Sequence, residues 1–208
     1  MKLYFHYCPS GFSNSYILGT NYSPEDSSPR EAIIIDPGLM DSNLLRVIED
    51  NNYTLKGILI THDHPHHVRG VKTIMRIYKT EIYAINPVIS EHRTSLIRDG
   101  DIINIGPFKT EVISVPGHSA DSAVFKINRL LFTGDSLTAG LMGSTNSSYA
   151  AATQVNALRS KLFPLPGDYT VLPGHGPPTS LEAERRFNMD VNTFEIHKNR
   201  RPPFKLDL

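Results

Sequence analysis

The sequence predicts an α/β domain whose strands form two layered sheets. Two observations support this fold class. Short apolar runs typical of strands alternate with helix-like segments, and strand-like runs also occur near both ends of the chain. The alternation favours a layered α/β domain, and strands near both ends favour two sheets over one parallel sheet. The 208 residues suit one domain, so we treat residues 1–208 as a unit.

The strand predictions rest on apolar runs bounded by turn residues. Residues 2–7 and 15–19 flank a Pro-Ser-Gly turn, and residues 32–35 form a continuous apolar run that ends at Asp36-Pro37-Gly38. Residues 20–31, which are rich in Ser, Pro and acidic side chains, are expected to form an exposed hairpin loop. The other predicted strands cover residues 57–60, 82–85, 102–105, 111–115, 123–127, 129–132 and 169–172.

The helix predictions rest on capping residues and apolar periodicity. Asp41 or Ser42 can cap a helix that runs to about residue 49. Residues 68–78 and 149–163 carry apolar side chains at helical spacing. The remaining segments follow from Pro, Gly and Ser signals: a short helix over residues 87–97, a loop over residues 136–148, and a last helix capped by Thr179 or Ser180 that runs to about residue 188.

Composition and charge exclude several classes of protein. The chain has 21 basic and 21 acidic residues, and this zero net charge argues against a nucleic-acid partner, which needs a basic excess. The single Cys8 cannot form an intramolecular disulfide, so we expect it to be a small strand or core residue. The basic, Pro-broken tail over about residues 197–208 is expected to be loosely packed.

The chain carries no signal for a membrane or for secretion. No window approaches the ~18 apolar residues of a membrane span. The apolar start of the chain is short, contains His6 and lacks a small-residue cleavage site. We therefore expect a soluble cytoplasmic protein that acts on a small molecule and has no membrane partner; this pattern does not predict an oligomeric state.

Histidine is the residue type that points to function, because six of the nine histidines fall in three short stretches. A fourth stretch adds a carboxylate, and each of the four directly follows a predicted strand. If those strands run in one direction, the four stretches meet at one edge of the sheets. The residues concerned are His62, His64, His66 and His67 in the first stretch, His118 in the second, His175 in the third and Asp135 in the fourth.

These residue types are suited to binding metal ions. Neutral imidazole binds zinc, iron or manganese, and a carboxylate can bridge two ions, so six imidazoles and one carboxylate suffice for two metals. Four histidines within six residues are hard to explain as turn residues. The three histidines outside the pattern, His6, His92 and His197, are interpreted as structural or surface residues.

The pattern resembles the metallo-β-lactamase superfamily, whose signature is His-x-His-x-Asp-His followed by Gly-His, Gly-Asp and Gly-His. The match extends over about residues 12–176, and the turn at Asp36 also matches. The resemblance implies a four-layer αββα sandwich of the α+β type with metals at one edge. It implies that His62, His64 and His118 hold a first metal, that Asp135 bridges, and that His67 and His175 hold a second metal together with residue 66.

Residue 66 departs from the family pattern, because His66 stands where the signature has Asp. An imidazole can ligate a metal but does not carry the carboxylate's negative charge. The site is then more positive by one charge, which lowers the pKa of bound water and weakens retention of a second cation. We expect either a two-metal site whose only carboxylate is Asp135 or a weakened second site. Zinc is the expected metal, as one or two ions, with iron or manganese as alternatives.

The resemblance is greatest to the small glyoxalase-II-like hydrolases, on residues 171–179 and 182–186. It implies that a metal supplies hydroxide to an activated acyl substrate, a thioester first and a lactone or ester next. Full glyoxalase II enzymes carry a further helical domain that helps bind glutathione, but only 33 residues follow His175. Gly143-Ser144 also replaces a frequent Gly-Arg. Both departures argue against specificity for glutathione.

Two alternatives stay open at this point. Some superfamily members use iron in redox reactions, such as sulfur dioxygenation, and this chain has neither the Glu ligand nor the flavin domain of the oxygen-reducing members. The departure at His66 also allows a degenerate, metal-binding member of the family.

Overall fold

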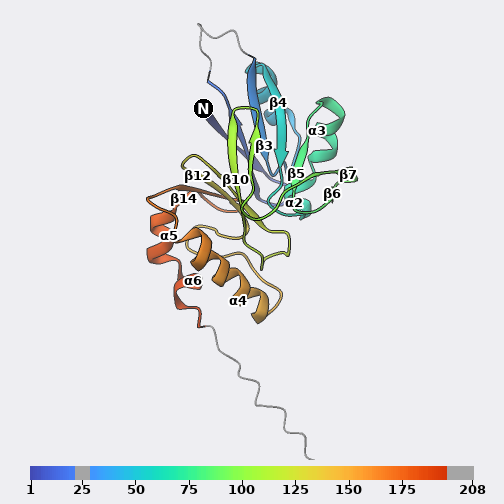
Figure 1. Cartoon of the computed structure of the whole chain (residues 1–208). Helices are drawn as coiled ribbons and strands as arrows, with labels where there is room; N and C mark the ends of the chain where they lie inside the picture. Colours follow the sequence, from blue (N-terminus) through green and yellow to red (C-terminus); the bar gives the residue numbers. More distant parts are fainter. Residues whose placement is uncertain (22–28, 196–208) are drawn as a thin grey trace, which may run out of the picture.

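The computed structural model describes residues 1–21 and 29–195, which form an αββα sandwich with two six-stranded sheets (Figure 1). The first sheet has the strand order β1-β2-β3-β4-β5-β8 and the second has the order β14-β13-β12-β11-β10-β9. A separate two-stranded hairpin consists of β6 (Val88–Ile89) and β7 (His92–Arg93). The predicted two-sheet α+β fold is therefore confirmed.

The first sheet comes from the N-terminal half of the chain. Its strands are β1 (Lys2–Cys8), β2 (Ser13–Gly19), β3 (Arg30–Ile35), β4 (Tyr53–Leu59), β5 (Ile82–Ala84) and β8 (Ser95–Leu96). Strands β1 to β3 pair antiparallel, whereas β3, β4, β5 and β8 pair parallel. The helices α1 (Ser42–Asp50), α2 (Pro65–Val68) and α3 (Val71–Ile77) belong to this half. Asp41 caps α1, as predicted, by accepting from the backbone N–H groups of Asn43 and Leu44.

The second sheet comes from the C-terminal half. Its strands are β9 (Ile102–Ile105), β10 (Phe108–Ser114), β11 (Ala123–Ile127), β12 (Leu130–Gly134), β13 (Thr170–Pro173) and β14 (Thr179–Ser180). Its helices are α4 (Ser148–Ala157), the π-helical turn η1 (Leu158–Leu162), α5 (Leu181–Phe187) and α6 (Met189–Thr193). Figure 1 shows α3 on one side of the sandwich and α4, α5 and α6 on the other.

Strand β3 shows why a continuous apolar run marks a strand in this fold. Ile33 and Ile35 pack between the two sheets with Phe108, Phe125 and Phe132, whereas Ile34 packs against the helices of the first half. Both faces of the strand are buried, so the period-2 alternation of polar and apolar residues disappears. A third cluster, between the second sheet and its helices, completes the layers.

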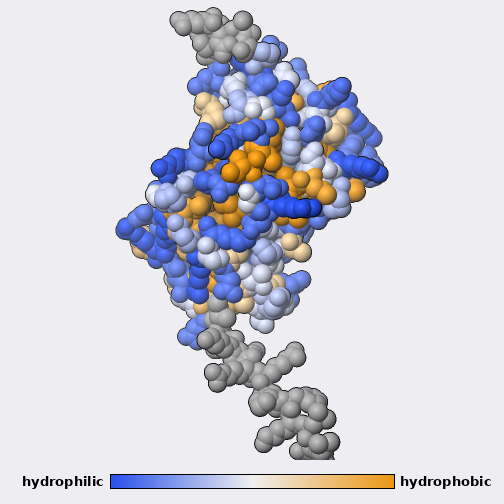
Figure 2. Space-filling view, in the orientation of Figure 1, coloured by the Kyte–Doolittle hydropathy of each residue, from blue (hydrophilic) through white to orange (hydrophobic). Residues whose placement is uncertain are grey.

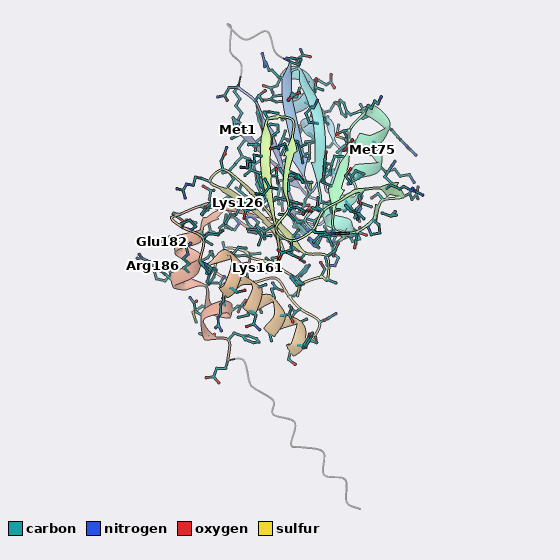
Figure 3. The ribbon with its side chains drawn as sticks, viewed as in Figure 1. Met1, Met75, Lys126, Lys161, Glu182 and Arg186 are labelled. Atoms are coloured by element: carbon teal, nitrogen blue, oxygen red, sulfur yellow. The ribbon has the colours of Figure 1, made fainter. Side chains whose placement is uncertain are left out.

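The surface of the sandwich is mostly polar, and some of its charged side chains connect the layers. Figure 2 shows a mostly hydrophilic face, with apolar side chains gathered near its middle. Lys161 of η1, labelled in Figure 3, lies on the helical side of the second sheet. Its Nζ donates to Asp99 at 2.8 Å and to the backbone oxygen of Ser114 in β10, and so connects the helical layer to the second sheet. Glu182 and Arg186 form an ion pair on α5. None of the described helices combines the length and the hydropathy that a membrane span requires.

The predicted helix over residues 87–97 is wrong. This segment forms β6, β7 and β8 instead, and Ser90 and Glu91 turn the hairpin with φ angles of +48° and +71°. The strand β8 then pairs with the edge of β5. A Pro at the start of the segment suggested a helix, but the unpaired edge of the first sheet offers backbone hydrogen bonds that local preference does not reveal.

Other boundaries differ by smaller amounts. The predicted helix over residues 68–78 is shorter, because α3 covers only Val71–Ile77 and α2 ends at Val68. Gly70 lies between the two helices, and its backbone approaches Pro37 so closely that a Cβ would lie 2.5 Å from the Pro37 oxygen. The predicted strands at residues 57–60 and 111–115 begin earlier, at Tyr53 and Phe108. Ser180 caps α5, as predicted. Most of the predicted loop over residues 20–31, and the tail with His197, lie outside the described residues.

Candidate metal centre

The chain segments that follow β4, β10, β12 and β13 meet at one edge of the sandwich. Strand β10 runs antiparallel to β11, which runs antiparallel to β12, and β12 runs parallel to β13. The three strands that precede His118, Asp135 and His175 therefore end at the same edge, as the sequence predicts. The structure brings six of the seven predicted residues into one cluster there, and His66 is the exception.

The first group of possible ligand atoms belongs to His62, His64, His118 and Asp135, all within 4.8 Å of one another. The Nδ1 atom of His64 lies 3.0 Å from Nε2 of His62 and 3.0 Å from Nε2 of His118. The Oδ2 atom of Asp135 lies 3.8 Å from Nε2 of His62 and 3.5 Å from Nε2 of His118. Three imidazole nitrogens and one carboxylate oxygen form a donor set that zinc takes in proteins.

The second group belongs to His67, Asp135 and His175. The Nε2 atom of His67 lies 3.5 Å from Oδ1 of Asp135, and Nε2 of His175 lies 3.5 Å from Oδ2. Nε2 of His67 and Oδ1 of Asp135 are buried, and neither has a hydrogen-bond partner among the described residues. Burying polar atoms without a partner is costly. A cation between them would satisfy both atoms, so the residues of this group fit a second metal.

Asp36 contacts His67 of the second group directly and His62 of the first group through Thr61. It is buried, and its φ of +48° lies in the left-handed region, where a non-glycine residue is strained. Its carboxylate accepts from the backbone N–H of Thr61 at 2.7 Å, from the Thr61 hydroxyl at 2.6 Å and from Nδ1 of His67 at 3.0 Å. The Thr61 hydroxyl in turn lies 3.0 Å from Nδ1 of His62. This network leaves Nε2 of both histidines free to bind a metal.

Backbone carbonyls orient two further histidines in the same way. Nδ1 of His118 donates to the backbone oxygen of Ser144 at 2.8 Å, and Nδ1 of His175 donates to that of Phe12 at 2.9 Å. A proton held at Nδ1 leaves the Nε2 lone pair for a cation. The side chain of His175 is 33% exposed and that of Asp135 is 13% exposed, so the centre opens to solvent on the His175 side.

The electrostatics of the cluster also suit a cation. Burial, together with the nearby His67, lowers the pKa of His62 to about 3, and burial lowers the pKa of His64 as well. Burial alone would raise the pKa of Asp135, but contact with His67 holds it well below its usual range. For His67, burial opposes the charged form, yet Asp36 and Asp135 raise its pKa. The ionised Asp135 and the neutral His62 and His64 therefore offer electron pairs to a cation. A cation at His67, in contrast, would have to displace a proton.

His66 lies beside the cluster rather than in it. Its side chain is exposed, its ring centroid is 6.4 Å from that of His175, and no described group of ligand atoms within 4.8 Å includes it. Of the histidines interpreted as structural, His6 is buried with Nε2 3.0 Å from the Asp41 carboxylate, and His92 lies on β7, away from the cluster.

Sequence reasoning missed the supporting role of two residues. Asp36 was identified only as part of a turn, although an acidic residue directly after a buried strand was a usable signal. Gln154 of α4 gave no signal beyond its place in a helix. It is fully buried; its Nε2 donates to the backbone oxygen of Ser136 at 2.9 Å, and its side chain packs against Gly117. Gln154 therefore contacts the neighbours in sequence of both Asp135 and His118.

We expect Gln154→Leu to weaken metal binding at the first group by about tenfold, because partners that only support metal ligands typically contribute 10–100-fold to affinity. The substitution keeps the volume but leaves the Ser136 oxygen without its donor. Isothermal titration with zinc measures the change. Asn156→Leu, at an exposed position on the same helix, is the matched control and should bind zinc as the wild type does. Equal affinities for both variants would contradict this role of Gln154.

The family model of the metallo-beta-lactamase superfamily matches residues 9–175, most of the chain. The chain belongs to the metallo-β-lactamase superfamily. The matched range contains all seven predicted site residues and Asp36. The superfamily includes hydrolases and is metal-dependent, and the structure of this chain contains a His/Asp cluster that could hold a metal.

Three similar proteins illustrate the range of this superfamily. The hydroxyacylglutathione hydrolase GloC of Haemophilus influenzae is 28% identical over 188 residues, which cover 79% of this chain and 89% of GloC. The crystal structure of the BLEG-1 B3 metallo-beta-lactamase has a TM-score of 0.79 at 23% identity, over 92% of this chain and all of that one. ETHE1 from Myxococcus xanthus has a TM-score of 0.77 at 26% identity, over 91% of this chain and 84% of its own.

Proposed function

We propose that this protein is a metal-dependent hydrolase of activated acyl compounds, with a thioester as the first candidate substrate and a lactone or ester next. The observation that carries the proposal is the convergence of five imidazoles on the single carboxylate of Asp135, at an edge that opens to solvent. Hydrolysis needs a nucleophile at neutral pH, and a metal held by these donors can supply one from water.

We propose zinc as the metal, in one or two ions, with iron or manganese as alternatives. His62, His64 and His118 would hold the first ion, His67 and His175 the second, and Asp135 would contact both. When bound, such an ion lowers the pKa of water from about 15.7 to about 7 and so supplies hydroxide at neutral pH.

The residues of the chain prepare the centre for this chemistry. Asp36, Thr61 and the two backbone carbonyls hold protons at Nδ1 and aim the Nε2 lone pairs inward. Asp135 supplies the one negative charge of the donor set. The partly exposed side chain of His175 marks the side from which a carbonyl substrate can approach. The buried side chains around the donors exclude water, and this exclusion strengthens the electrostatic interactions.

The likeness to GloC supports a thioester as first candidate. A hydroxyacylglutathione hydrolase that aligns over 89% of its own length has little room for a large additional domain. The short segment after His175 therefore no longer argues against a glutathione thioester as substrate. Gly143-Ser144 still differs from the usual Gly-Arg of that group.

The test is hydrolysis by protein loaded separately with zinc, iron or manganese. The substrates are a hydroxyacylglutathione, a simple acyl thioester, a lactone and an ester. We expect hydrolysis of at least one thioester, with activity removed by a chelator and restored by the metal. A His62→Ala variant controls for contaminating hydrolases. Failure on every substrate with full metal loading would contradict a hydrolase and favour a degenerate, metal-binding protein.

A second candidate is an iron-dependent sulfur dioxygenase, which the likeness to the dioxygenase-like ETHE1 favours. It predicts oxygen consumption on a persulfide by the iron-loaded protein and no hydrolysis of thioesters. An oxygen electrode measures this directly, with the zinc-loaded protein as the control.

A further inference from the structure

The turn between β1 and β2, residues 9–12, carries the side chain of His66 on one face. Gly11 has a φ of +113°, and a Cβ at this position would lie 2.2 Å from Nδ1 and 2.7 Å from Cγ of His66. The imidazole therefore fills the space that a side chain at residue 11 would need. In addition, the hydroxyl of Ser13 donates to the backbone oxygen of His66 at 2.7 Å. Both the ring and the backbone of His66 thus contact this turn and the strand that follows it.

The same turn also contacts His175. The backbone oxygen of Phe12 accepts from Nδ1 of His175 at 2.9 Å, and Phe12 itself has a φ of +55°. Ser13 forms an isolated β-bridge with His175, and the next backbone N–H, of Asn14, donates to the Gly174 oxygen at 2.7 Å. The orientation of the His175 ring therefore depends on where the turn places the Phe12 carbonyl.

We infer that His66 is a positioning residue rather than a metal ligand: its ring packs against Gly11 and holds the turn whose Phe12 carbonyl orients His175. The inference rests on the proposed metal centre, in which His175 holds the second ion. It accounts for the departure from the family signature at residue 66. An acidic side chain there is replaced by a planar ring that fits against a glycine, and His67, Asp135 and His175 remain as the ligands of the second ion.

His66→Phe and His66→Ala separate positioning from ligation. Phenylalanine keeps a planar ring against Gly11 but has no nitrogen to bind a metal, whereas alanine removes both. If His66 positions the turn, His66→Phe should bind the second zinc ion as the wild type does. His66→Ala should bind it about 10–100-fold more weakly, the usual effect of losing a supporting partner. Isothermal titration resolves the two ions, and the affinity for the first ion reports whether each variant is folded.

Two patterns of zinc affinity would overturn the inference. Equal losses in both variants would mean that the His66 nitrogen is a ligand, and unchanged affinity in both would mean that the ring has no role. His92→Ala, which removes a histidine on β7, is the matched control and should leave both affinities unchanged.

An NMR measurement tests the same inference without bound metal. The proton on Nδ1 of His175 should give a slowly exchanging signal in the wild type and in His66→Phe, and a broadened one in His66→Ala. An unchanged signal in His66→Ala would contradict positioning. If the wild type bound no zinc at all, the proposed function would fail, whereas the NMR comparison would still decide whether His66 holds the turn.

Discussion

Asp135→Asn is expected to abolish metal binding at both groups and to lower the hydrolase activity by more than about 100-fold. The magnitude follows because partners that only support a ligand already contribute 10–100-fold, and Asp135 is itself the shared donor. Three histidine nitrogens lie within 3.5 Å of its carboxylate, and a fourth lies at 3.8 Å. An amide of the same shape keeps the packing but removes the negative charge that balances the cations.

Metal content by elemental analysis and kcat/KM on the best substrate measure this effect. Asp63→Asn is the matched control, because Asp63 is an exposed carboxylate between His62 and His64 in the sequence. It should keep both its metal and its activity. Retention of two ions in Asp135→Asn would show that the carboxylate is not shared between the groups and would contradict the proposed centre.

Asp36→Asn is expected to leave the fold largely intact but to lower the affinity for the second ion by about 10–100-fold. Asn tolerates the left-handed φ of +48° at this position, and its amide oxygen can still accept from Thr61. The amide N–H₂ group, however, would face Nδ1 of His67, which now donates at 3.0 Å. The proton of His67 would then move to Nε2 and block the lone pair that faces Asp135.

Asp36→Ala separates this tautomer effect from simple loss of stability. It removes the carboxylate that accepts from Thr61 and from Nδ1 of His67. Alanine at this position would also keep the strained φ of +48° without a side-chain hydrogen bond to offset it. We expect it to cost about 3–5 kcal/mol in the free energy of unfolding, the usual loss when one member of a buried charged pair is removed. Chemical denaturation of the metal-free proteins measures this. If Asp36→Asn bound the second ion as tightly as the wild type, the tautomer of His67 would not be controlled by Asp36.

Much of the fold could be predicted because burial leaves a mark in the sequence. The runs at residues 32–35 and 57–60 are continuously apolar because strands β3 and β4 are covered on both faces. The cap at Asp41 is similarly local, since its side chain bonds to backbone only two and three residues ahead. The segment at residues 87–97 could not be predicted, because its strand β8 exists by pairing with β5, a partner selected by the tertiary fold.

The candidate site likewise has features that the sequence predicts and features that only the fold decides. Motif spacing predicted seven donors, since each follows a strand end and carries a metal-binding side chain. The structure brings six of them together, and His66 lies outside the group. Spacing does not reveal which nitrogen of a ring faces inward. That depends on acceptors far away in the sequence, such as the Phe12 and Ser144 carbonyls, which reach His175 and His118 only after folding.

The sequence by itself determined the family and the two-sheet class, and it predicted seven candidate donors, because these depend on residue type and on local order along the chain. Only the tertiary structure decided how the donors are grouped and oriented. It placed Asp36 behind His67, packed Gln154 behind the ligand loops and set His66 against Gly11, outside the donor cluster. These contacts join segments that are distant in the chain, and short-range hydrogen bonds and packing act on atoms only once the fold has brought them together.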